Sequence, residues 1–237
     1  MLFNKLIISE NEVLRIVEDA LSYKKQLILS YFNQHCFNIY KSHSDYKNLL
    51  NNKCTVFLDG FGVYMALNFL GYKNVQKFNA TDLYQKIFQQ FSLNQTKLFL
   101  IGDDFSDEFI SGETKKKNLK ICGYQNGYFK GGEFNVIIEA INKSSPDVII
   151  IGMGVPKQEI LAAKISRSIQ NKVILCVGGF LEFYFETKKR APAVMRNFGF
   201  EWLHRLITEP ARLWKRYQIG IPVFFINVIK EYFKQHK

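Results

Sequence analysis

The chain has 237 residues, 47% of them hydrophobic and 22% charged, a composition that excludes a largely disordered protein. Its formal net charge is +11, and its longest apolar run, 219–229, contains Gly, Pro and Asn. About 20 apolar residues are needed to cross a bilayer, so we expect no membrane span. The four cysteines are scattered without CxxC or Cys/His spacing, which predicts free thiols and no structural metal.

Short apolar segments alternate with helical patterns along the first 190 residues. The strand-like segments, rich in Ile, Val, Leu and Phe, are 26–32, 54–58, 97–101, 119–122, 147–151 and 173–177. Apolar residues at helical spacing indicate helices at about 9–21, 34–51, 62–70, 81–91, 107 onward, 133–143 and 156–168. This alternation predicts an α/β fold, a Rossmann-like parallel sheet with helices on both faces.

The composition changes near Ala191-Pro192. From 188 to 237 there are eleven Lys or Arg residues and three acids, so this segment holds 11 − 3 = +8 of the net charge. It also contains Trp202, Trp214 and the apolar run 219–229. We therefore predict a core of residues 1–190 and a basic, apolar helical appendage of residues 191–237. Such a surface suits an anionic membrane interface better than a nucleic acid, with the run 219–229 supplying apolar contact.

Loops at the carboxyl ends of parallel strands meet at one edge of a sheet, and ligands bind there. Asp59 directly follows a predicted strand and precedes Gly60 and Gly62. Its carboxylate could act as a general base at the mouth of the sheet. The same position also suits an N-cap of the next helix, and the sequence alone slightly favours that alternative.

Two other strand ends hold polar or glycine-rich sequences. Gly152-Met-Gly-Val-Pro-Lys-Gln-Glu159 joins a Gly-x-Gly turn to a helix start that could hold a phosphate, although a tight turn without a ligand fits equally well. Asp103, Asp104 and Asp107 could indicate magnesium, but we favour their complementing the dipole of the following helix.

Several motifs occur in one order along the chain. They are Tyr31-Phe-Asn33, Leu58-Asp59-Gly60-Phe-Gly62, Asn79-Ala-Thr-Asp82, Gly152–Glu159, Lys189-Arg-Ala-Pro192, Phe200-Glu-Trp-Leu-His-Arg205 and Glu209-Pro-Ala-Arg212-Leu-Trp-Lys-Arg216. In this combination the chain resembles the WecG/TagA/CpsF family of bacterial glycosyltransferases from about residue 5 to 217. The resemblance implies an inverting enzyme that moves a sugar, often N-acetylmannosamine, from a UDP-sugar to a polyprenyl-diphosphate-linked sugar during surface polysaccharide synthesis.

The resemblance also implies roles for individual residues. Asp59 falls on the family's proposed catalytic base, and Asn33 on the asparagine of its first loop. The substrate-binding residues it implies are Asn33, Tyr31, Lys77, Thr81, Asp82, Gly152, Gly154, Lys157, Gln158, Arg205, Arg212, Lys215 and Arg216. No metal or other cofactor is expected, because the arginines of the appendage and a helix amino end could stabilise the departing diphosphate.

Four positions depart from the family pattern. Tyr31 stands where many members have Thr, and Lys77 where many have Arg, which replaces a bidentate phosphate contact by a point charge. Glu182 and Glu186 stand where Asp and Gly are common. These differences suggest that the donor sugar differs from that of other members. The expected donor therefore carries an N-acetylmannosamine-like sugar or another hexose.

The resulting expectation is a peripheral glycosyltransferase on the cytoplasmic face of the cell membrane. A non-catalytic nucleotide-sugar-binding protein is the main alternative, and the presence of Asp59 favours the enzyme. Nucleic-acid binding by the basic tail is a further alternative, against which the interleaved apolar residues of 219–229 count. The oligomeric state stays open, although an exposed apolar appendage favours a homo-oligomer.

Overall fold

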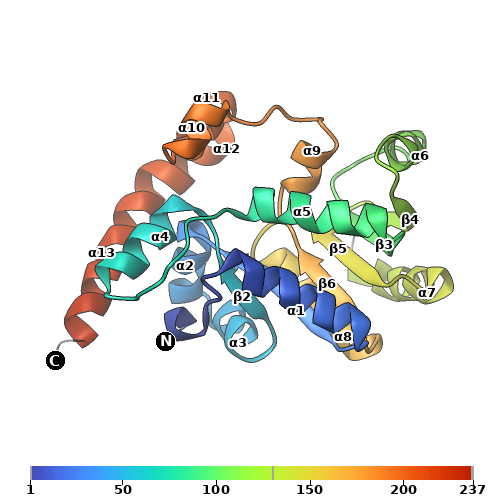
Figure 1. The fold of residues 1–237 in the computed structure, drawn as a ribbon, viewed down its shortest axis with the longest axis horizontal. Coiled ribbons are helices and arrows are strands. Elements are labelled where there is room, and N and C mark those ends of the chain that lie inside the picture. The colour runs from blue at the N-terminus through green and yellow to red at the C-terminus, as the bar shows by residue number, and fades with distance from the viewer. Residues whose placement is uncertain (1, 130, 236–237) are drawn as a thin grey trace.

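One parallel sheet organises the molecule (Figure 1). The computed structural model describes residues 2–129 and 131–235, with the backbone alone at Asn197 and Arg212. The six strands lie in the order β2-β1-β6-β5-β3-β4 and are all parallel. Their bounds are β1 Leu27–Phe32, β2 Thr55–Leu58, β3 Lys97–Gly102, β4 Lys120–Gln125, β5 Val148–Gly152 and β6 Val173–Cys176. The predicted α/β fold with a Rossmann-like parallel sheet is confirmed.

Helices surround the sheet and continue beyond it toward the C-terminus. In the core they are η1 Leu2–Lys5, α1 Glu10–Ser22, α2 Gln34–Ser42, α3 Ser44–Asn52, α4 Gly60–Phe69, α5 Ala80–Leu93, α6 Asp107–Lys116, η2 Gly131–Glu133, α7 Phe134–Ser144, α8 Lys157–Ser168 and α9 Phe180–Tyr184. In the appendage they are α10 Ala193–Asn197, α11 Glu201–Thr208, α12 Pro210–Trp214, η3 Lys215–Ile219 and α13 Gly220–Gln235. The predicted helical appendage is therefore present.

The strands are almost entirely apolar because both faces of the sheet are covered. Side chains alternate along a strand, so Leu27 and Leu29 pack with α1 and α5, while Ile28 packs with α7 and α8 on the opposite face. A further apolar cluster fills the β1–β2 end under α2, α3 and α4. These three clusters hold the strand ends, and the loops that follow them, in fixed positions.

The segment 34–51, predicted as one helix, forms two. The backbone of His43 is extended, and its Nδ1 accepts a hydrogen bond from the backbone N–H of Tyr46, which caps the start of α3. The prediction of a single helix was wrong: the polar residues 41–45 interrupt the apolar pattern, and the break falls among them. Tyr40, Tyr46 and Leu50 are all buried in the same cluster.

The appendage is partly built into the core. On α13, Phe224 and Val228 are buried in the same cluster as Phe37 of α2, and the rings of Phe37 and Phe224 pack edge to face at 5.3 Å. Asn38 donates a hydrogen bond to the carbonyl of Gly220 over 2.7 Å. The expectation that the whole run 219–229 offers membrane contact is therefore wrong for Phe224 and Val228. The division of the chain at residue 190 stays a prediction.

No helix among the described residues has the length and apolar character needed to cross a bilayer. All four cysteines are free, as expected.

Candidate active site

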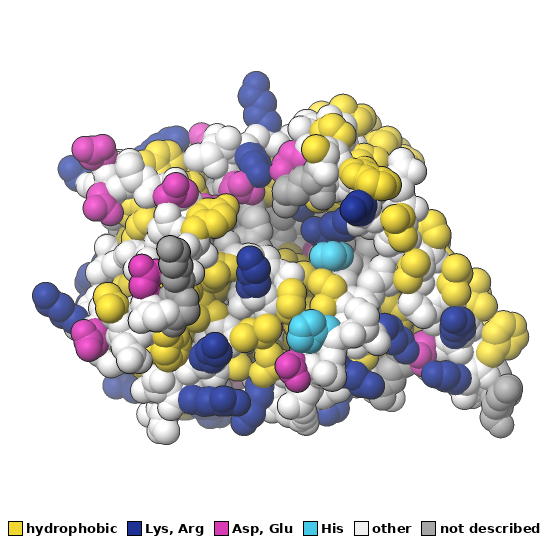
Figure 2. Space-filling model, turned by 180° about the vertical axis from the view of Figure 1, so that it is seen from behind, with side chains coloured by type: hydrophobic (Ala, Val, Ile, Leu, Met, Phe, Trp, Pro, Cys, Tyr) yellow, Lys and Arg dark blue, Asp and Glu magenta, His cyan; other side chains and the backbone are white. Residues whose placement is uncertain are grey.

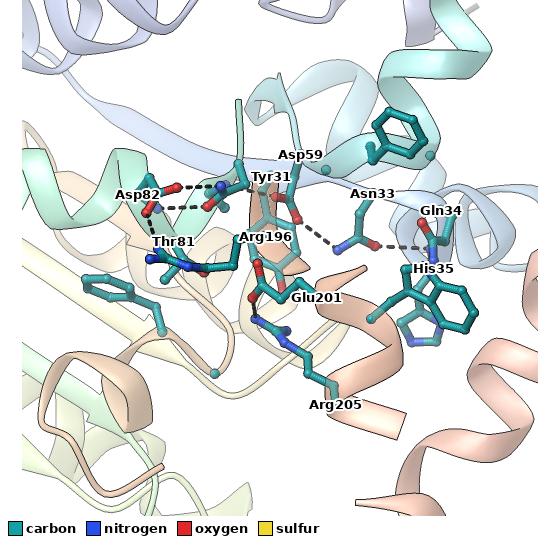
Figure 3. Close-up of a pocket in the computed structure, with 18 of the residues that line it drawn as sticks. Tyr31, Asn33, Gln34, His35, Asp59, Thr81, Asp82, Arg196, Glu201 and Arg205 are labelled. Atoms are coloured by element: carbon teal, nitrogen blue, oxygen red, sulfur yellow. Dashed lines mark hydrogen bonds and ion pairs between the residues drawn. The ribbon is translucent and has the colours of Figure 1, made fainter. Parts of the chain in front are cut away.

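A cavity of about 1250 Å³ lies between the carboxyl ends of the strands and the appendage. Its floor comes from the loops after β1, β2 and β6 and from the start of α5. The opposite wall comes from α11, α12, η3 and the first turns of α13. Figure 3 shows these residues converging from both sides. Of the residues predicted for the site, Tyr31, Asn33, Asp59, Lys77, Thr81, Asp82, Gly154, Arg205 and Arg216 line the cavity.

Asp59 occupies the N-cap position of α4, yet its side chain makes no capping hydrogen bond to that helix. Its Oδ1 accepts from the backbone N–H of Ala80 over 2.8 Å, and its Oδ2 accepts from Nδ2 of Asn33 over 3.0 Å. The carboxylate is thus held by two donors from outside its own helix, and the capping interpretation of Asp59 is wrong. Burial raises the pKa of Asp59, while the donors and the charge of Arg205 partly oppose that rise.

Asn33 fixes the orientation of Asp59 because its own amide has no freedom to turn. Its Oδ1 caps α2 by accepting from the backbone N–H groups of His35 and Cys36, each over 3.1 Å. Its Nδ2 is thereby directed at Asp59 (Figure 3). A capping asparagine therefore links the start of α2 to the carboxylate at the end of β2.

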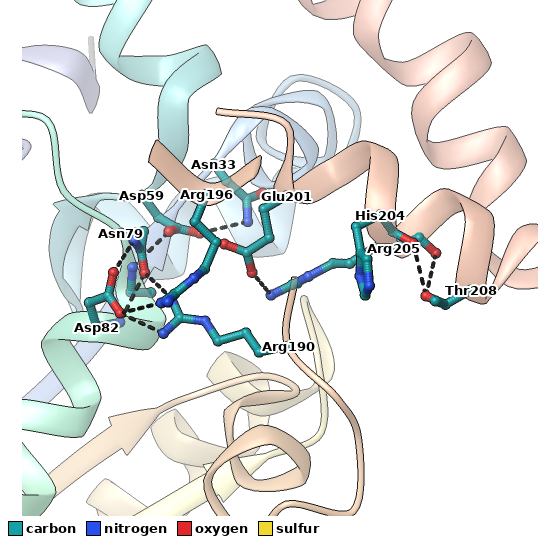
Figure 4. A network of polar contacts seen from close by, with 11 residues as sticks. Asn33, Asp59, Asn79, Asp82, Arg190, Arg196, Glu201, His204, Arg205 and Thr208 are labelled. Atoms are coloured by element: carbon teal, nitrogen blue, oxygen red, sulfur yellow. Dashed lines mark hydrogen bonds and ion pairs between the residues drawn. The ribbon is translucent and has the colours of Figure 1, made fainter. Parts of the chain in front are cut away.

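A second polar network closes the α5 side of the cavity (Figure 4). Asn79 caps α5 by accepting from the backbone N–H of Asp82, and its Nδ2 donates to the Asp82 carboxylate over 2.6 Å. Arg190 reaches across from the linker to the appendage, and its Nη1 donates to Oδ1 of Asp82 over 2.5 Å. Arg196 approaches the same oxygen at 3.6 Å. Burial alone would raise the pKa of Asp82, but the hydrogen bonds from Arg190 and Asn79 lower it overall.

Besides Arg196, the appendage presents Arg205 and Arg216 to the cavity. Nη2 of Arg205 donates to Oε1 of Glu201 over 2.6 Å, one turn apart on α11. Burial acts against the charge of Arg205, but Glu201, Tyr217 and Asp59 favour it, so the pKa of Arg205 is raised overall. Within the described side chains, Arg216 forms no ion pair.

Buried guanidinium nitrogens without a partner surround this space. The Nε atoms of Arg190, Arg196, Arg205 and Arg216 are all buried without a hydrogen-bond partner among the described residues. Arg196, Arg205 and Arg216 line the cavity, so their other guanidinium N–H groups can meet a ligand that enters it. The arrangement suits a ligand rich in anionic oxygens, such as a diphosphate.

Arg216 also affects His35, which lines the cavity at the start of α2. Burial first, and the charge of Arg216 second, lower the pKa of His35 to about 4. The imidazole is therefore neutral at physiological pH in this state of the protein.

The Gly152–Glu159 segment is divided between the cavity and the core. Gly154, with φ of +73°, lines the cavity, and a Cβ there would meet open space. Gln158 is fully buried, its Oε1 accepts from the backbone N–H of Gly178, and its Nε2 donates to buried Glu159. Oε1 of Glu159 also accepts from Ser30 over 2.7 Å. This chain of bonds supports the turn after β6, so Gln158 is placed to position that turn rather than to touch a ligand.

Other predicted site residues also lie apart from the cavity lining. Gly152 is buried at the end of β5, where a Cβ would meet the carbonyl of Gly178 at 2.9 Å. Lys157 is exposed on α8. Lys215 is exposed, with its ammonium over the Trp214 ring. The side chain of Arg212 lies outside the described part of the structure.

The polar residues that sequence reasoning missed include Asn79, Arg190, Arg196 and Glu201, as well as His35. Asn79 and Arg190 stand inside motifs that carried the family resemblance, which was the available signal for them. Glu201 also stands in such a motif, four residues before Arg205 on α11, which is the spacing of a helical ion pair. Nothing in the local sequence indicates that Arg196 approaches Asp82.

The acidic cluster after β3 is split. Asp107 lies in the first turn of α6, where it complements the helix dipole as predicted. Asp103 and Asp104 lie in the preceding loop instead, and Oδ2 of Asp103 is buried without a hydrogen-bond partner among described residues. Burial, reinforced by Glu182, raises the pKa of Asp103 to about 6. No group of three or more His, Cys, Asp or Glu within residues 2–129 and 131–235 is arranged to hold a metal ion.

Comparison with known proteins agrees with this geometry. The family model described as "Glycosyl transferase WecG/TagA/CpsF family" matches residues 4–237. The chain belongs to this glycosyltransferase family. It is therefore an enzyme of the glycosyltransferase class, built on the parallel sheet described above.

Characterised relatives extend the comparison. The chain is 27% identical over 191 residues, covering 78% of this chain and 72% of the relative, to an N-acetylglucosaminyldiphosphoundecaprenol N-acetyl-beta-D-mannosaminyltransferase of Bacillus spizizenii. It is 27% identical over 192 residues to the protein of the same name from Bacillus subtilis, covering 79% of this chain and 73% of that one. The protein of that name from Staphylococcus aureus is 29% identical over 204 residues, covering 84% and 78%.

Proposed function

We propose that this glycosyltransferase moves a sugar from a UDP-sugar to a polyprenyl-diphosphate-linked sugar, with inversion at the transferred carbon. The observation that carries the proposal is the Asp59 carboxylate, held by Asn33 and Ala80 at the floor of a cavity whose opposite wall carries Arg205 and Arg216. A base and an anion-binding wall facing each other are what such a displacement needs.

The reaction assigns a task to each side of the cavity. Asp59 takes the proton of the acceptor hydroxyl as its oxygen forms a bond to the anomeric carbon of the donor sugar. The bond from that carbon to the UDP oxygen breaks at the same time, and UDP leaves with the electron pair. Arg205, which lies close enough to Asp59 to affect its pKa, stabilises the charge that develops on the UDP diphosphate, while Arg216 is left for the diphosphate of the acceptor.

This division of tasks requires no metal ion, because guanidinium groups supply the positive charge that a divalent cation would otherwise provide. Lys77 and Thr81 line the same cavity and extend the donor set toward α5. Gly154, in the loop after β5, leaves space for the nucleoside end of the donor.

The relatives' names suggest the substrates for this chain. We infer an N-acetylmannosamine-like donor, or another hexose, and an acceptor of the N-acetylglucosaminyl-diphospho-polyprenol type. The residues around Asp59 select the donor sugar. Tyr31 stands beside the Gly178 turn, with its hydroxyl 2.4 Å from where a Gly178 Cβ would lie, and Glu182 lines the cavity nearby.

A membrane-bound acceptor calls for an enzyme at the membrane surface. The exposed large apolar side chains of the appendage are Val194, Phe198, Phe200, Ile207, Trp214, Ile219, Val223, Phe225, Ile226, Ile229 and Phe233. Figure 2 displays hydrophobic side chains gathered along the edge formed by α11 to α13, with Lys and Arg among them. We infer peripheral binding to the cytoplasmic face of the membrane through this edge, with pairing of two copies as the competing use of the same surface.

A screen of UDP-sugars against a short-chain lipid-diphosphate acceptor, read out as UDP release, tests the proposal. We expect release that depends on both substrates and that Asp59→Ala abolishes. Asp45→Ala, at an exposed position on α3, is the matched control and should keep full activity. UDP binding without any acceptor-dependent release across the screen would instead favour a non-catalytic binding protein.

A further inference from the structure

The cavity has two chemically different ends. Asp59 and Asp82 mark the polar end at the strand loops. The other end is lined by Trp202 of α11, Tyr217 of η3, and Ile221 and Phe225 of α13. The rings of Trp202 and Tyr217 lie 5.8 Å apart and form one side of this apolar end. Polar and apolar surfaces therefore belong to one continuous space.

The change from charge to apolar surface runs along η3 and the start of α13. Tyr217, Ile221 and Phe225 recur at spacings of four residues, so they point in similar directions from consecutive turns, and Arg216 adjoins Tyr217 at the charged end. Nine residues separate Arg216 from Phe225, which is roughly 13 Å along a helix axis. A ligand bound to the guanidinium of Arg216 can thus extend along two or more turns of apolar side chains.

The apolar end opens to the exterior. Phe225 lines the cavity and is 47% exposed, so it stands at the rim. Next to it on α13, Ile226 and Ile229 are exposed but do not line the cavity. The apolar lining at Phe225 therefore adjoins the exposed apolar residues of α13, and Figure 2 shows hydrophobic side chains along that edge.

We propose that Trp202, Tyr217, Ile221 and Phe225 form a binding groove for the first prenyl units of the acceptor lipid, next to its diphosphate. This assignment rests on the proposed function. The acceptor carries its reacting sugar, its diphosphate and its lipid chain in that order. Only a groove that changes from carboxylate to guanidinium to apolar side chains matches all three parts at once.

Two features favour a lipid diphosphate over a peptide helix or a second copy of the chain. Arg205 and Arg216 line the cavity beside the groove, and a phosphate supplies acceptors for their guanidinium N–H groups while an apolar helix supplies none. The groove also leads inward to Asp59, where a folded element of another protein would block the reaction. The lipid chain accordingly leaves the cavity between Trp202 and Phe225 and enters the membrane beside α13.

Binding measurements on the whole protein test the groove without requiring catalysis. Farnesyl diphosphate, below its micelle concentration, is compared with inorganic diphosphate as the headgroup-only probe, using tryptophan fluorescence and calorimetry. We expect farnesyl diphosphate to bind at least roughly tenfold more tightly, because its chain buries apolar surface. The Ile221→Ser/Phe225→Ser variant should lose most of that difference while binding inorganic diphosphate like the parent protein.

The Ile226→Ser/Ile229→Ser variant is the matched control, since it makes the same changes on the same helix outside the cavity. It should keep the full preference for farnesyl diphosphate, and equal thermal melting of both variants verifies their folding. Equal affinity of the two probes for the parent protein overturns the groove. The groove is also overturned if the Ile221→Ser/Phe225→Ser variant keeps the full preference for farnesyl diphosphate, or if it loses affinity for both probes equally.

Transfer assays separate this proposal from the proposed function. If no acceptor ever receives a sugar while farnesyl diphosphate still binds through Ile221 and Phe225, the function fails and the groove stands. If sugar is transferred equally well to acceptors with short and long chains, in the parent and in both variants, the function stands and the groove fails.

Discussion

Exchanging the residues at positions 33 and 59 is the sharpest test of how the base is held. Asp59→Asn alone should lower turnover by roughly 10²–10⁴, the usual contribution of general acid–base catalysis. The variant is not a neutral isostere, however. The amide oxygen of the new side chain can still accept from the backbone N–H of Ala80. In that orientation its NH₂ group faces Nδ2 of Asn33. Two donors would face each other in a partly buried site.

Asn33 cannot relieve this conflict by turning over. Its Oδ1 already caps α2 by accepting from His35 and Cys36, and losing such a cap costs about 1 kcal/mol. An unsatisfied buried donor costs about 1–3 kcal/mol. The double variant Asp59→Asn/Asn33→Asp restores one acceptor opposite one donor, because an aspartate at 33 caps α2 equally well and accepts from the new amide.

We therefore expect the double variant to be more stable than Asp59→Asn by about 1–3 kcal/mol, or roughly 2–12 °C in melting temperature for a chain of this size. Calorimetry measures that difference, and UDP release measures activity. Both variants should remain at least roughly 10²-fold less active than the parent, since neither keeps a carboxylate at position 59. Near-normal turnover in either variant removes Asp59 from the role of base. Equal melting temperatures contradict the inference that the Asn33 cap locks it.

Three further outcomes follow from the geometry. Because burial raises the pKa of Asp59, kcat/KM should fall as pH drops through a midpoint above the ordinary value of 3.8. The charge of Glu201 contributes to that raised pKa, so Glu201→Gln should move the midpoint to lower pH. Transfer should continue in EDTA. If EDTA abolishes transfer and magnesium restores it, the guanidinium groups do not stabilise the departing diphosphate on their own. Phe224→Ser should cost about 3 kcal/mol of stability because that ring is buried, whereas Phe225→Ser should leave melting nearly unchanged and weaken sedimentation with anionic vesicles.

The sheet could be predicted because its strands are short, apolar and buried on both faces. The break at His43 is not predicted, because the buried residues on both sides of the polar run 41–45 belong to one cluster. Only the extended backbone of His43 and its bond to Tyr46 reveal two helices. Periodicity reports which side of a segment is buried, and two helices that bury one side against the same cluster are easily taken for one.

The site was predictable where a residue's position along the chain already fixes its direction. Asp59 follows a strand, so the sheet places it at the mouth of the cavity. Gln158 stands in a recognisable motif, but its first-turn position on α8 turns its amide inward to Gly178. The contact between Asp82 and Arg190 joins residues 108 positions apart, and no local pattern encodes it. A motif identifies a residue, while packing decides what that residue touches.

The appendage connects membrane binding to the chemistry because one face of α13 is buried in the core and the other is exposed. Phe224 and Val228 lie in the core against α2, while Ile226 and Ile229 are exposed on the same helix. The ion pair of Lys41 with Glu231 fastens α13 further along α2. The start of α2 is capped by Asn33, which holds Asp59. A membrane bound at the exposed face of α13 would therefore be held at a fixed orientation to the base, through packed helices rather than through a flexible tether. An anchor of this kind brings the enzyme to its acceptor and also sets the direction from which the acceptor hydroxyl approaches Asp59.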